Sequence, residues 1–416
     1  MRRIPCKLRR LAILVYWLVL CFYGQPHAGA PLHGAKAASM GTAFVAVADD
    51  PSAIVHNPAG IATMEGTHTY NGVTAIFPTT KYTSTGGESE RTKFRVFFPP
   101  HLYLCSNMKT EKVSFGLGVF SPFGVGGRYW DKNSPTRFVS IKSTIASVAI
   151  NPVFAIKATP DLSIGIGFFY LHSLNTAERR VDQSIFGADT AKFSLEADGG
   201  GWGYNLGFLW KPRENLSFGI AYRSHIKVHQ SGEAKLKYIA TPLQPFFGGR
   251  KFETDIDTDV DFPDLLNFGV AYLPVQNVTL SIEAEFGNWS RFDKQEIDFD
   301  KEIPAAGFTD CTIDLDWEDA WILKFGIEYR LKDSLAFRAG YVFVETPVPD
   351  RTLSPCNPDS KQHNFTIGMG YSSGKWTLDW FYCASFFKDR KVKNETLTGE
   401  YENFIHYLGL SVGYRF

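Results

Sequence analysis

The last thirteen residues of the chain alternate between two kinds of side chain. One face carries mostly large apolar or aromatic groups, at Phe404, His406, Leu408, Leu410, Val412, Tyr414 and Phe416, and the other face carries mostly small or polar ones. Such a strand can meet lipid on one side and a lumen on the other, and a terminal strand that ends on an aromatic residue is typical of bacterial outer-membrane barrels. The ending therefore predicts an all-β chain that closes a transmembrane barrel.

The first residues have the build of a cleavable secretory signal. Basic residues precede an apolar run from Leu11 to Tyr23, and small residues follow at Gly24 and from Ala28 to Ala30. We expect a signal peptide over residues 1–28, with cleavage near Ala28 or Ala30. The alternative, an uncleaved anchor helix, would need about 20 apolar residues.

Composition limits the classes of function. The chain has 43 basic and 43 acidic residues, and loss of the basic signal leaves the remainder mildly acidic, so nucleic-acid binding is not expected. No later stretch offers 18 consecutive apolar residues, so a membrane would be crossed by strands. Aromatic residues make up 15% of the chain, which suits lipid-facing walls.

Residues 67–416 read as a fourteen-stranded antiparallel transmembrane β-barrel. Short turns alternate with long segments, as periplasmic turns alternate with extracellular loops. The long segments are 80–92, 125–137, 178–189, 239–251, 291–315, 346–361 and 389–400. The predicted strands are 67–79, 93–108, 112–124, 138–158, 161–177, 190–211, 214–238, 252–274, 277–290, 316–331, 334–345, 362–373, 375–388 and 401–416. The fourteenth strand is expected to pair with the first.

The charged residues predict a polar lumen. In the seventh strand Arg223, His225, Lys227 and His229 share one face, while Ile220, Ile226 and Val228 share the other. A charge facing lipid near the midplane costs about 2 to 4 kcal/mol, so the charged face should point inward. Four inward-phase cations are candidates to bind a substrate carboxylate: Lys142, Arg223, Lys324 and Arg338. The alternative for each is an ordinary lumenal salt bridge, to Glu283, Glu285, Glu328 or Asp379.

Residues 29–66 differ from the strands. Small residues dominate, and Pro51 and Pro58 exclude one continuous helix, so a compact, mostly helical plug inside the barrel is expected. Asn57 is suited to cap a turn that Pro58 begins, a structural role that can coexist with gating. Asp49 and Asp50 are expected to pair with inward cations, Arg415 among them, or to be solvated in a wet lumen.

Five different sequence motifs follow one another along the chain. They are Asp49 and Asp50 followed by Asn57, Pro58, Ala59 and Gly60; SPFG at Ser121–Gly124, then Arg128 and Tyr129; FPDLLNFGVAY at Phe262–Tyr272; NWSRFD at Asn288–Asp293; and FRAGYVFVETPVPD at Phe337–Asp350. In these motifs the chain resembles the FadL/TodX/OmpP1 family of outer-membrane transporters for long-chain fatty acids and aromatic hydrocarbons. The resemblance implies uptake of hydrophobic compounds without ATP, a movable N-terminal hatch, and lateral exit at a kink in the third strand.

The third strand carries a break in its own sequence. Ser121, Pro122, Phe123 and Gly124 interrupt the alternation, because Pro122 lacks an N–H for the ladder and Gly124 bends easily. This predicts an opening in the wall. The alternative is that Pro122 merely ends the strand at a loop.

The remaining expectations concern other chemistry and partners. Cys311 and Cys356 lie in consecutive long loops, where an oxidising compartment would permit a disulfide. No metal, cofactor or enzymatic activity is expected; Ser224 and His225, for example, are adjacent in a strand and face opposite ways. Expected partners are a hydrophobic small molecule, outer-membrane lipid and lipopolysaccharide, and the barrel-assembly machinery through the strand ending at Phe416; the family suggests a monomer. A general porin and a secretion or surface-assembly scaffold are the alternatives.

Overall fold

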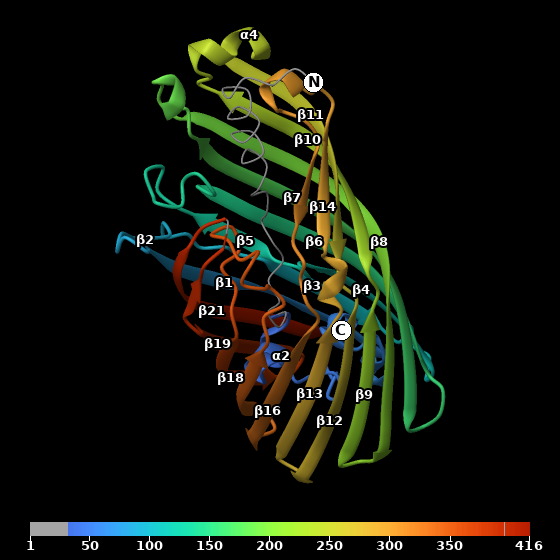
Figure 1. Ribbon diagram of the computed structural model, residues 1–416. Helices are drawn as coiled ribbons and strands as arrows, with labels where there is room; N and C mark the ends of the chain where they lie inside the picture. The colour runs from blue at the N-terminus through green and yellow to red at the C-terminus, as the bar shows by residue number, and fades with distance from the viewer. Residues whose placement is uncertain (1–31, 395) are drawn as a thin grey trace.

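The structure, a computed structural model, describes residues 32–394 and 396–416, and the predicted signal peptide lies outside them. The described chain is a closed antiparallel barrel (Figure 1). Fourteen strands, some of them in two segments, make up its wall, which confirms the predicted number of strands. In chain order they are β1 (Thr67–Ser84), β3 (Pro100–Ser106), β4 (Val113–Phe120) with β5 (Val125–Tyr129), β6 (Lys142–Lys157), β7 (Leu162–Val181), β8 (Ala191–Arg213), β9 (Leu216–Arg223) with β10 (Ile226–Lys237), β11 (Lys251–Phe262) with β12 (Leu265–Val275), β13 (Val278–Gly287) with β14 (Lys294–Phe299), β15 (Cys311–Asp314) with β16 (Ala320–Lys332), β17 (Leu335–Val344), β18 (Gln362–Ser373), β19 (Trp376–Phe387) and β21 (Gly399–Arg415).

The last strand closes the barrel onto the first, as predicted. β21 pairs with β1 along its whole length, from His68 opposite Arg415 to Ser84 opposite Gly399. Leu408 and Leu410 are exposed on the outside, whereas Gly409 and Ser411 are buried inside. The alternation read from the sequence therefore gives the correct facing of this strand.

The long connections hold more structure than the sequence predicted. The segment 125–137 was expected to be a loop, but β5 pairs there with β6, because Val125–Tyr129 resumes the ladder after the break. The segment 291–315 contains β14 and β15, and β14 also pairs with β11. Smaller elements complete this end of the barrel: β2 (Ser89–Arg91), η2 (Ser184–Phe186), η3 (Thr241–Leu243), α4 (Gln244–Phe247), η4 (Trp289–Arg291), η5 (Pro304–Ala306) and β20 (Arg390–Val392).

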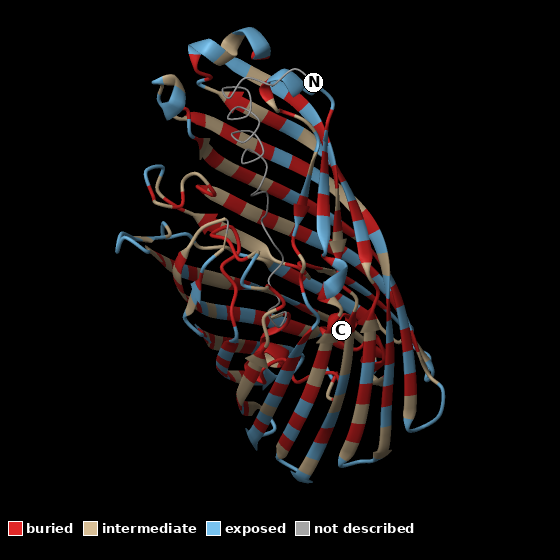
Figure 2. Ribbon diagram, in the orientation of Figure 1, coloured by how far each residue is buried: buried red, intermediate tan, exposed pale blue. Residues whose placement is uncertain are grey.

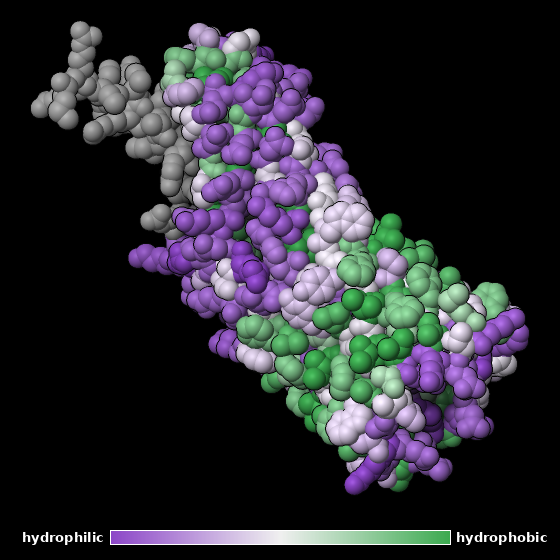
Figure 3. Space-filling view, turned by 90° about the vertical axis from the view of Figure 1, so that its right-hand side faces the viewer, coloured by the Kyte–Doolittle hydropathy of each residue, from purple (hydrophilic) through white to green (hydrophobic). Residues whose placement is uncertain are grey.

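The outer surface has two zones. Figure 3 shows an apolar band over the half of the barrel toward the short turns and a polar surface over the half toward the long loops. The band is built from outward side chains such as Phe208, Phe268 and Phe325, each more than a third exposed. Alternate burial along each strand, visible as stripes in Figure 2, separates these side chains from the inward ones. The band supplies the surface that lipid requires.

The facing of the seventh predicted strand changes along its length, so the prediction that its charges all point inward is wrong. Arg223 is buried inside, but the strand breaks at Ser224 and His225 before β10 begins. Beyond the break, Ile226 and Val228 are fully buried, and Lys227 and His229 face outward. The break shifts the alternation by one residue, which transfers each side chain to the opposite face.

The interior therefore has two parts, and the uniformly polar lumen expected from the sequence is also wrong. Toward the long loops the inside is apolar, with one buried cluster that includes Phe193, Phe262, Phe299, Phe308 and Trp317. The outer face of the same strands carries charged residues. Because this zone lies beyond the apolar band, water surrounds it and its hydrophobic core lies within.

Residues 32–66, which we call the inner segment, lie in the lumen at the level of the apolar band (Figure 1). The inner segment forms α2 (Ala35–Ser39), α3 (Ala53–His56) and the 3-10 helix η1 (Pro58–Thr63), and nearly all its residues are buried. In the described part of the chain, no helix combines the length and apolar character needed to cross a bilayer.

Candidate functional site

The inner segment is attached to the wall by hydrogen bonds on several sides. Ser217 Oγ of β9 donates to Ala46 O at 2.7 Å, and Thr366 Oγ1 of β18 donates to Ser39 O at 2.9 Å. Glu283 Oε2 of β13 accepts from the backbone N–H groups of Phe44 and Val45, each at 2.8 Å. Buried backbone groups of a short irregular segment need such partners, so the wall determines its conformation.

Asn57 has the capping role that the sequence predicted. Its Oδ1 accepts from the N–H of Ala59 at 3.1 Å, and Pro58 begins η1. Its Nδ2 donates to Val45 O at 2.7 Å and to Phe208 O of β8 at 3.0 Å. A Cβ at Gly207 would lie 2.2 Å from Asn57 Oδ1, so a glycine is required where the inner segment meets this strand.

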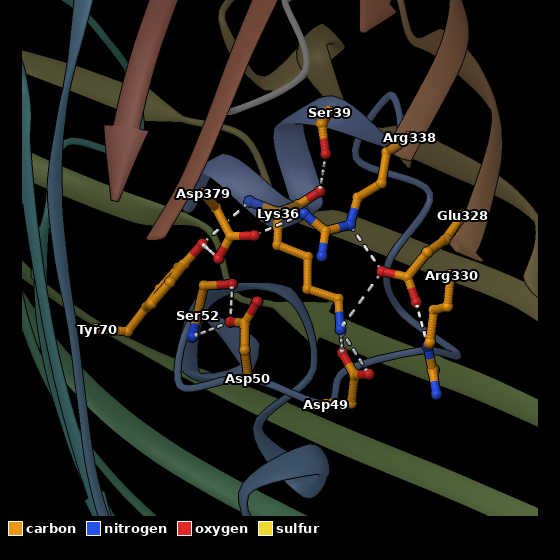
Figure 4. A network of polar contacts seen from close by, with 10 residues as sticks. All are labelled: Lys36, Ser39, Asp49, Asp50, Ser52, Tyr70, Glu328, Arg330, Arg338 and Asp379. Carbon is orange, nitrogen blue, oxygen red and sulfur yellow. Dashed lines mark hydrogen bonds and ion pairs between the residues drawn. The ribbon is translucent and has the colours of Figure 1, made fainter. Parts of the chain in front are cut away.

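A chain of charged groups joins the inner segment to β16, β17 and β19 (Figure 4). Lys36 Nζ lies 2.7 Å from Asp49 and 3.9 Å from Glu328. Arg338 Nε donates to Glu328 Oε2 at 2.7 Å, and Arg338 Nη1 donates to Asp379 Oδ1 at 2.6 Å. Charges buried together in a lumen are tolerated because each has an opposite charge and a hydrogen bond.

Asp49 and Asp50 of the inner segment have different partners, and neither partner is Arg415. Arg415 is instead 4.0 Å from Glu65, so the expected contact with Asp49 or Asp50 is wrong: both carboxylates have nearer donors within the inner segment. Asp50 Oδ1 accepts from the N–H and hydroxyl of Ser52 at 2.7 and 2.5 Å. Its Oδ2 is sealed from solvent and meets no donor among the described residues, and burial raises the pKa of this carboxyl to about 6.

The four candidate cations occupy different environments. Lys324 pairs with Glu283 and Glu285, each at 2.7 Å, and Arg338 pairs with Glu328 and Asp379. Arg223 Nη2 donates to Val55 O at 2.9 Å, and its guanidinium lies 5.8 Å from the ring centre of Phe120. Lys142 shares the outward phase of β6 with Val148 and Ile150, so its predicted inward position is wrong.

The barrel wall is interrupted beside β4. β4 pairs with β6 as far as Phe120 opposite Ala149, and β5 resumes with Val125 opposite Ala146. Four residues, Ser121–Gly124, therefore stand opposite two on β6, which is a large bulge. Gly124 has φ +117°, which strongly favours glycine.

On the other side of the bulge the backbone ladder is interrupted. β3 stays paired with β4 only to Leu102 opposite Val119, and the next backbone contact across is the Lys93 N–H bond to Tyr129 O at 2.7 Å. Between residues 94–99 and 121–128 the described chain has no backbone hydrogen bond. We call this break in the backbone hydrogen bonding the wall gap. Because β5 rejoins the wall beyond it, Pro122 interrupts the strand and does not end it.

A cavity, which we call the gap cavity, lies at the wall gap. It holds about 980 Å³, including space open to solvent. Ile76, Phe97, Pro122, Ile145 and Ile405 supply apolar lining, and Leu32 and His33 of the inner segment close its inner side. A second cavity, mostly charged, lies nearer the short turns and is lined by Lys36, Asp49 and Asp50 among others. The inner segment thus borders both cavities.

The predicted disulfide is not formed. Cys311 lies in β15 and packs with the large apolar cluster, whereas Cys356 packs with Val139 in a separate cluster. The two loops are consecutive in sequence but hold these cysteines in different places. No bond joins Cys311 to Cys356.

Other reactive arrangements are unremarkable among the residues that the structure describes. None of their His, Cys, Asp and Glu side chains gather in a group of three suited to a metal ion. His225 bonds to Asp261 at 2.6 Å on the outer surface. A GxSxG match at Gly370–Gly374 lies in the β18–β19 hairpin, not in the strand-to-helix turn that such a nucleophile needs.

The sequence did not predict that some residues of the gap cavity would lie there. Residues 94–99 were assigned to a strand, and Arg128 to a loop, whereas both border the opening. Arg128 is buried, and the alternation of residues along 125–129 is the sequence feature that predicts an inward side chain at this position. That signal is short, because it covers only five residues.

Comparison with known proteins identifies the family. The sequence matches over residues 19–416 the family described as outer membrane protein transport protein (OMPP1/FadL/TodX). The chain belongs to this family. It is 25% identical to a putative outer membrane protein of Neisseria meningitidis serogroup B, with 92% of each chain covered. It is 21% identical to the long-chain fatty acid transport protein of Escherichia coli O6:H1, with 88% of each covered.

Solved structures share the fold. A FadL homologue of Pseudomonas aeruginosa aligns with a TM-score of 0.82 at 19% identity, covering 94% of this chain and all of that one. The toluene transporter TodX of P. putida aligns with a TM-score of 0.76 at 17% identity, covering 92% and 98%. The barrel and its family place the chain in the outer membrane as a multi-pass β-barrel, among transporters and channels.

Proposed function

We propose that this protein takes up hydrophobic compounds, long-chain fatty acids or aromatic hydrocarbons, across the outer membrane. The cargo enters the apolar interior beneath the long loops, passes to the gap cavity, and leaves sideways through the wall gap. The observation that carries this proposal is the wall gap, because an opening at the level of the apolar band releases an apolar molecule into lipid without exposing it to water.

The inner segment is the hatch in this proposal. It lies in the lumen and is bonded to several wall strands, which supports a plugged barrel over an open porin. Asn57 holds it to β8, and Lys36, which also pairs with Asp49, holds it to Glu328 of β16; rearrangement of these contacts opens the route from the interior to the gap cavity. The second, charged cavity keeps apolar cargo from leaving on the periplasmic side, since burying an alkyl chain among charges is unfavourable.

The partners in this proposal follow from the surface. The apolar band contacts outer-membrane lipid, and the polar zone above it meets lipopolysaccharide. The strand ending at Phe416 is the element that the barrel-assembly machinery would receive. A closed wall leaves no strand edge for pairing with a second copy, which favours a monomer.

Deletion of Pro122 and Phe123 tests the proposed exit. After the deletion, Ser121 and Gly124 remain opposite Val148 and Ser147 of β6. The ladder can then continue from β4 into β5 without changing which side chains face inward. We expect uptake of radiolabelled oleate and toluene to fall at least tenfold in an Escherichia coli strain that lacks its own long-chain fatty acid transport protein.

Deletion of Gly86 and Gly87 in the exposed turn between β1 and β2 is the matched control, and uptake should be retained. Heat-modifiable migration on gels checks that both barrels fold. Undiminished uptake by a folded Pro122–Phe123 deletion would refute lateral exit. Large steady conductance of the wild-type protein in planar bilayers would instead favour a porin, and absence of any solute-specific uptake would favour a scaffold.

A further inference from the structure

The gap cavity contains several buried polar atoms that meet no hydrogen-bond partner among the described residues. They are Arg128 Nε, Ser143 Oγ, His33 Nε2, and Nδ2 and Oδ1 of Asn357. The four residues come from β5, β6, the inner segment and the β17–β18 loop, yet all line the same cavity. An orphaned buried polar group is costly, so such a gathering indicates a place that a polar ligand group completes.

Arg128 is the charged member of this set. It is 3% exposed, and its Nη1 donates a long hydrogen bond of 3.4 Å to the O of Gly127. Among the described residues it forms no ion pair within 4 Å, unlike Lys324 and Arg338. The nearby carboxylate of Asp359 is occupied, accepting from Thr346 Oγ1 at 2.6 Å and from Gln362 Nε2 at 3.3 Å.

We propose that Arg128, with Ser143, Asn357 and His33, forms a carboxylate-binding site in the gap cavity, so that the protein prefers acidic amphiphiles to neutral hydrocarbons of the same length. A buried guanidinium without a partner calls for an anion, and its planar donors match a carboxylate. The inference rests on the proposed function and deepens it by naming the cargo class.

The remainder of the cavity fits the rest of such a molecule. Ile76, Phe97, Ile145 and Ile405 offer an apolar surface for an alkyl chain beside the polar group. Burial lowers the pKa of His33 well below its usual value, so a neutral imidazole lies at this position. A neutral imidazole leaves Arg128 as the source of positive charge in the cavity.

Equilibrium binding of three probes with one chain length tests the site: dodecanoate, 1-dodecanol and dodecyl phosphate, with the full chain in lipid nanodiscs. We expect the wild type to bind dodecanoate more tightly than 1-dodecanol. Arg128→Gln should raise the Kd of dodecanoate at least tenfold and leave that of 1-dodecanol within twofold. Arg91→Gln, at an exposed position of β2, is the matched control and should change neither.

Ser143→Ala provides a second variant in case the loss of Arg128 prevents folding. Because it removes one small donor, we expect a two- to fivefold rise in the Kd of dodecanoate alone. Equal losses for acid and alcohol in both variants, or no loss in either, would overturn the carboxylate site. Tighter Arg128-dependent binding of dodecyl phosphate than of dodecanoate would overturn it in favour of a lipid phosphate.

The same measurements separate the two proposals. If the wild type transports and binds both probes without preference for the acid, the uptake function stands and the carboxylate site fails. If the wild type neither binds these probes nor takes up oleate or toluene, the proposed function itself fails.

Discussion

Lys324 holds two acidic side chains of β13 together inside the barrel. It is 1% exposed and lies 2.7 Å from both Glu283 and Glu285, and Glu283 in turn accepts two backbone hydrogen bonds from the inner segment. Lys324→Met keeps the length of the side chain but leaves two buried carboxylates uncompensated. We expect the free energy of unfolding in urea, measured in lipid vesicles, to fall by about 3 to 5 kcal/mol.

Lys332→Met, at the exposed end of β16, is the control for this variant and should stay within about 0.5 kcal/mol of the wild type. The triple variant Lys324→Met, Glu283→Gln, Glu285→Gln should recover part of the loss, because no charge is then left unpaired. A Lys324→Met protein as stable as the wild type would show that water reaches these carboxylates.

The sequence predicts the facing of Lys324 and Glu283 and offers a salt bridge to Glu283, Glu285, Glu328 or Asp379 as an alternative role for Lys324, but it does not single out the partners. Alternation puts each on the inward side of its strand, and burial agrees. Their contact depends on register, which sets Glu283 opposite Lys324 in the β13–β16 ladder. Register follows from turn geometry and packing across the whole wall, so a single strand cannot reveal it. For the same reason, nothing in the sequence indicated that Arg128 lacks a partner.

The inner segment is the element whose movement the proposed function requires. A cysteine pair can hold it still: Ala46→Cys and Ser217→Cys, whose residues are joined by a 2.7 Å hydrogen bond, in a protein whose own cysteines are replaced by alanine. We expect oxidation to lower uptake of oleate at least tenfold and dithiothreitol to restore it, because the covalent link fixes the hatch to β9.

The matched pair for this experiment lies entirely within the wall. Thr80 of β1 and Asn403 of β21 are also joined by a hydrogen bond, of 2.6 Å, and their cysteine variant should form a link without changing uptake. Unchanged uptake through a fully linked Ala46–Ser217 pair would exclude a moving hatch. Loss of uptake with both pairs would point to general rigidity of the barrel.

The element that sequence reasoning placed least well is the strand of β9 and β10. Its apolar residues keep one phase from Leu216 to Val228 with the single exception of Ser224, so one face is expected throughout. In the folded chain Ser224 bonds with Tyr204 through both its N–H and its hydroxyl, each at 2.9 Å, and β10 restarts on the opposite phase. The only sign of this change in the sequence is one polar residue in an apolar row, and a single serine does not tell a break from an ordinary strand position.

At the scale of the whole molecule, this phase change divides the barrel into a part within lipid and a part above it. Below the break, outward residues such as Ile220 are apolar; above it, outward residues such as Lys227 are charged and inward residues such as Val228 are apolar. A uniform barrel with a polar lumen would have the opposite facing above the break. The long loops continue this upper part, so it should lie outside the cell.

Labelling of single cysteines with a membrane-impermeant maleimide on intact cells tests that arrangement. We expect rapid labelling at Lys227→Cys, because the side chain faces water, and at least tenfold slower labelling at the neighbouring Val228→Cys, which faces the packed interior. Ile220→Cys should also resist, since lipid covers it. Ser334→Cys, in the short turn between β16 and β17, should react only after the outer membrane is permeabilised. Fast labelling at Ser334→Cys and none at Lys227→Cys in intact cells would show that the barrel has the opposite orientation in the membrane. Equal labelling of Lys227→Cys and Val228→Cys would show that the interior of the upper barrel is filled with water. In that case the apolar route to the gap cavity does not exist.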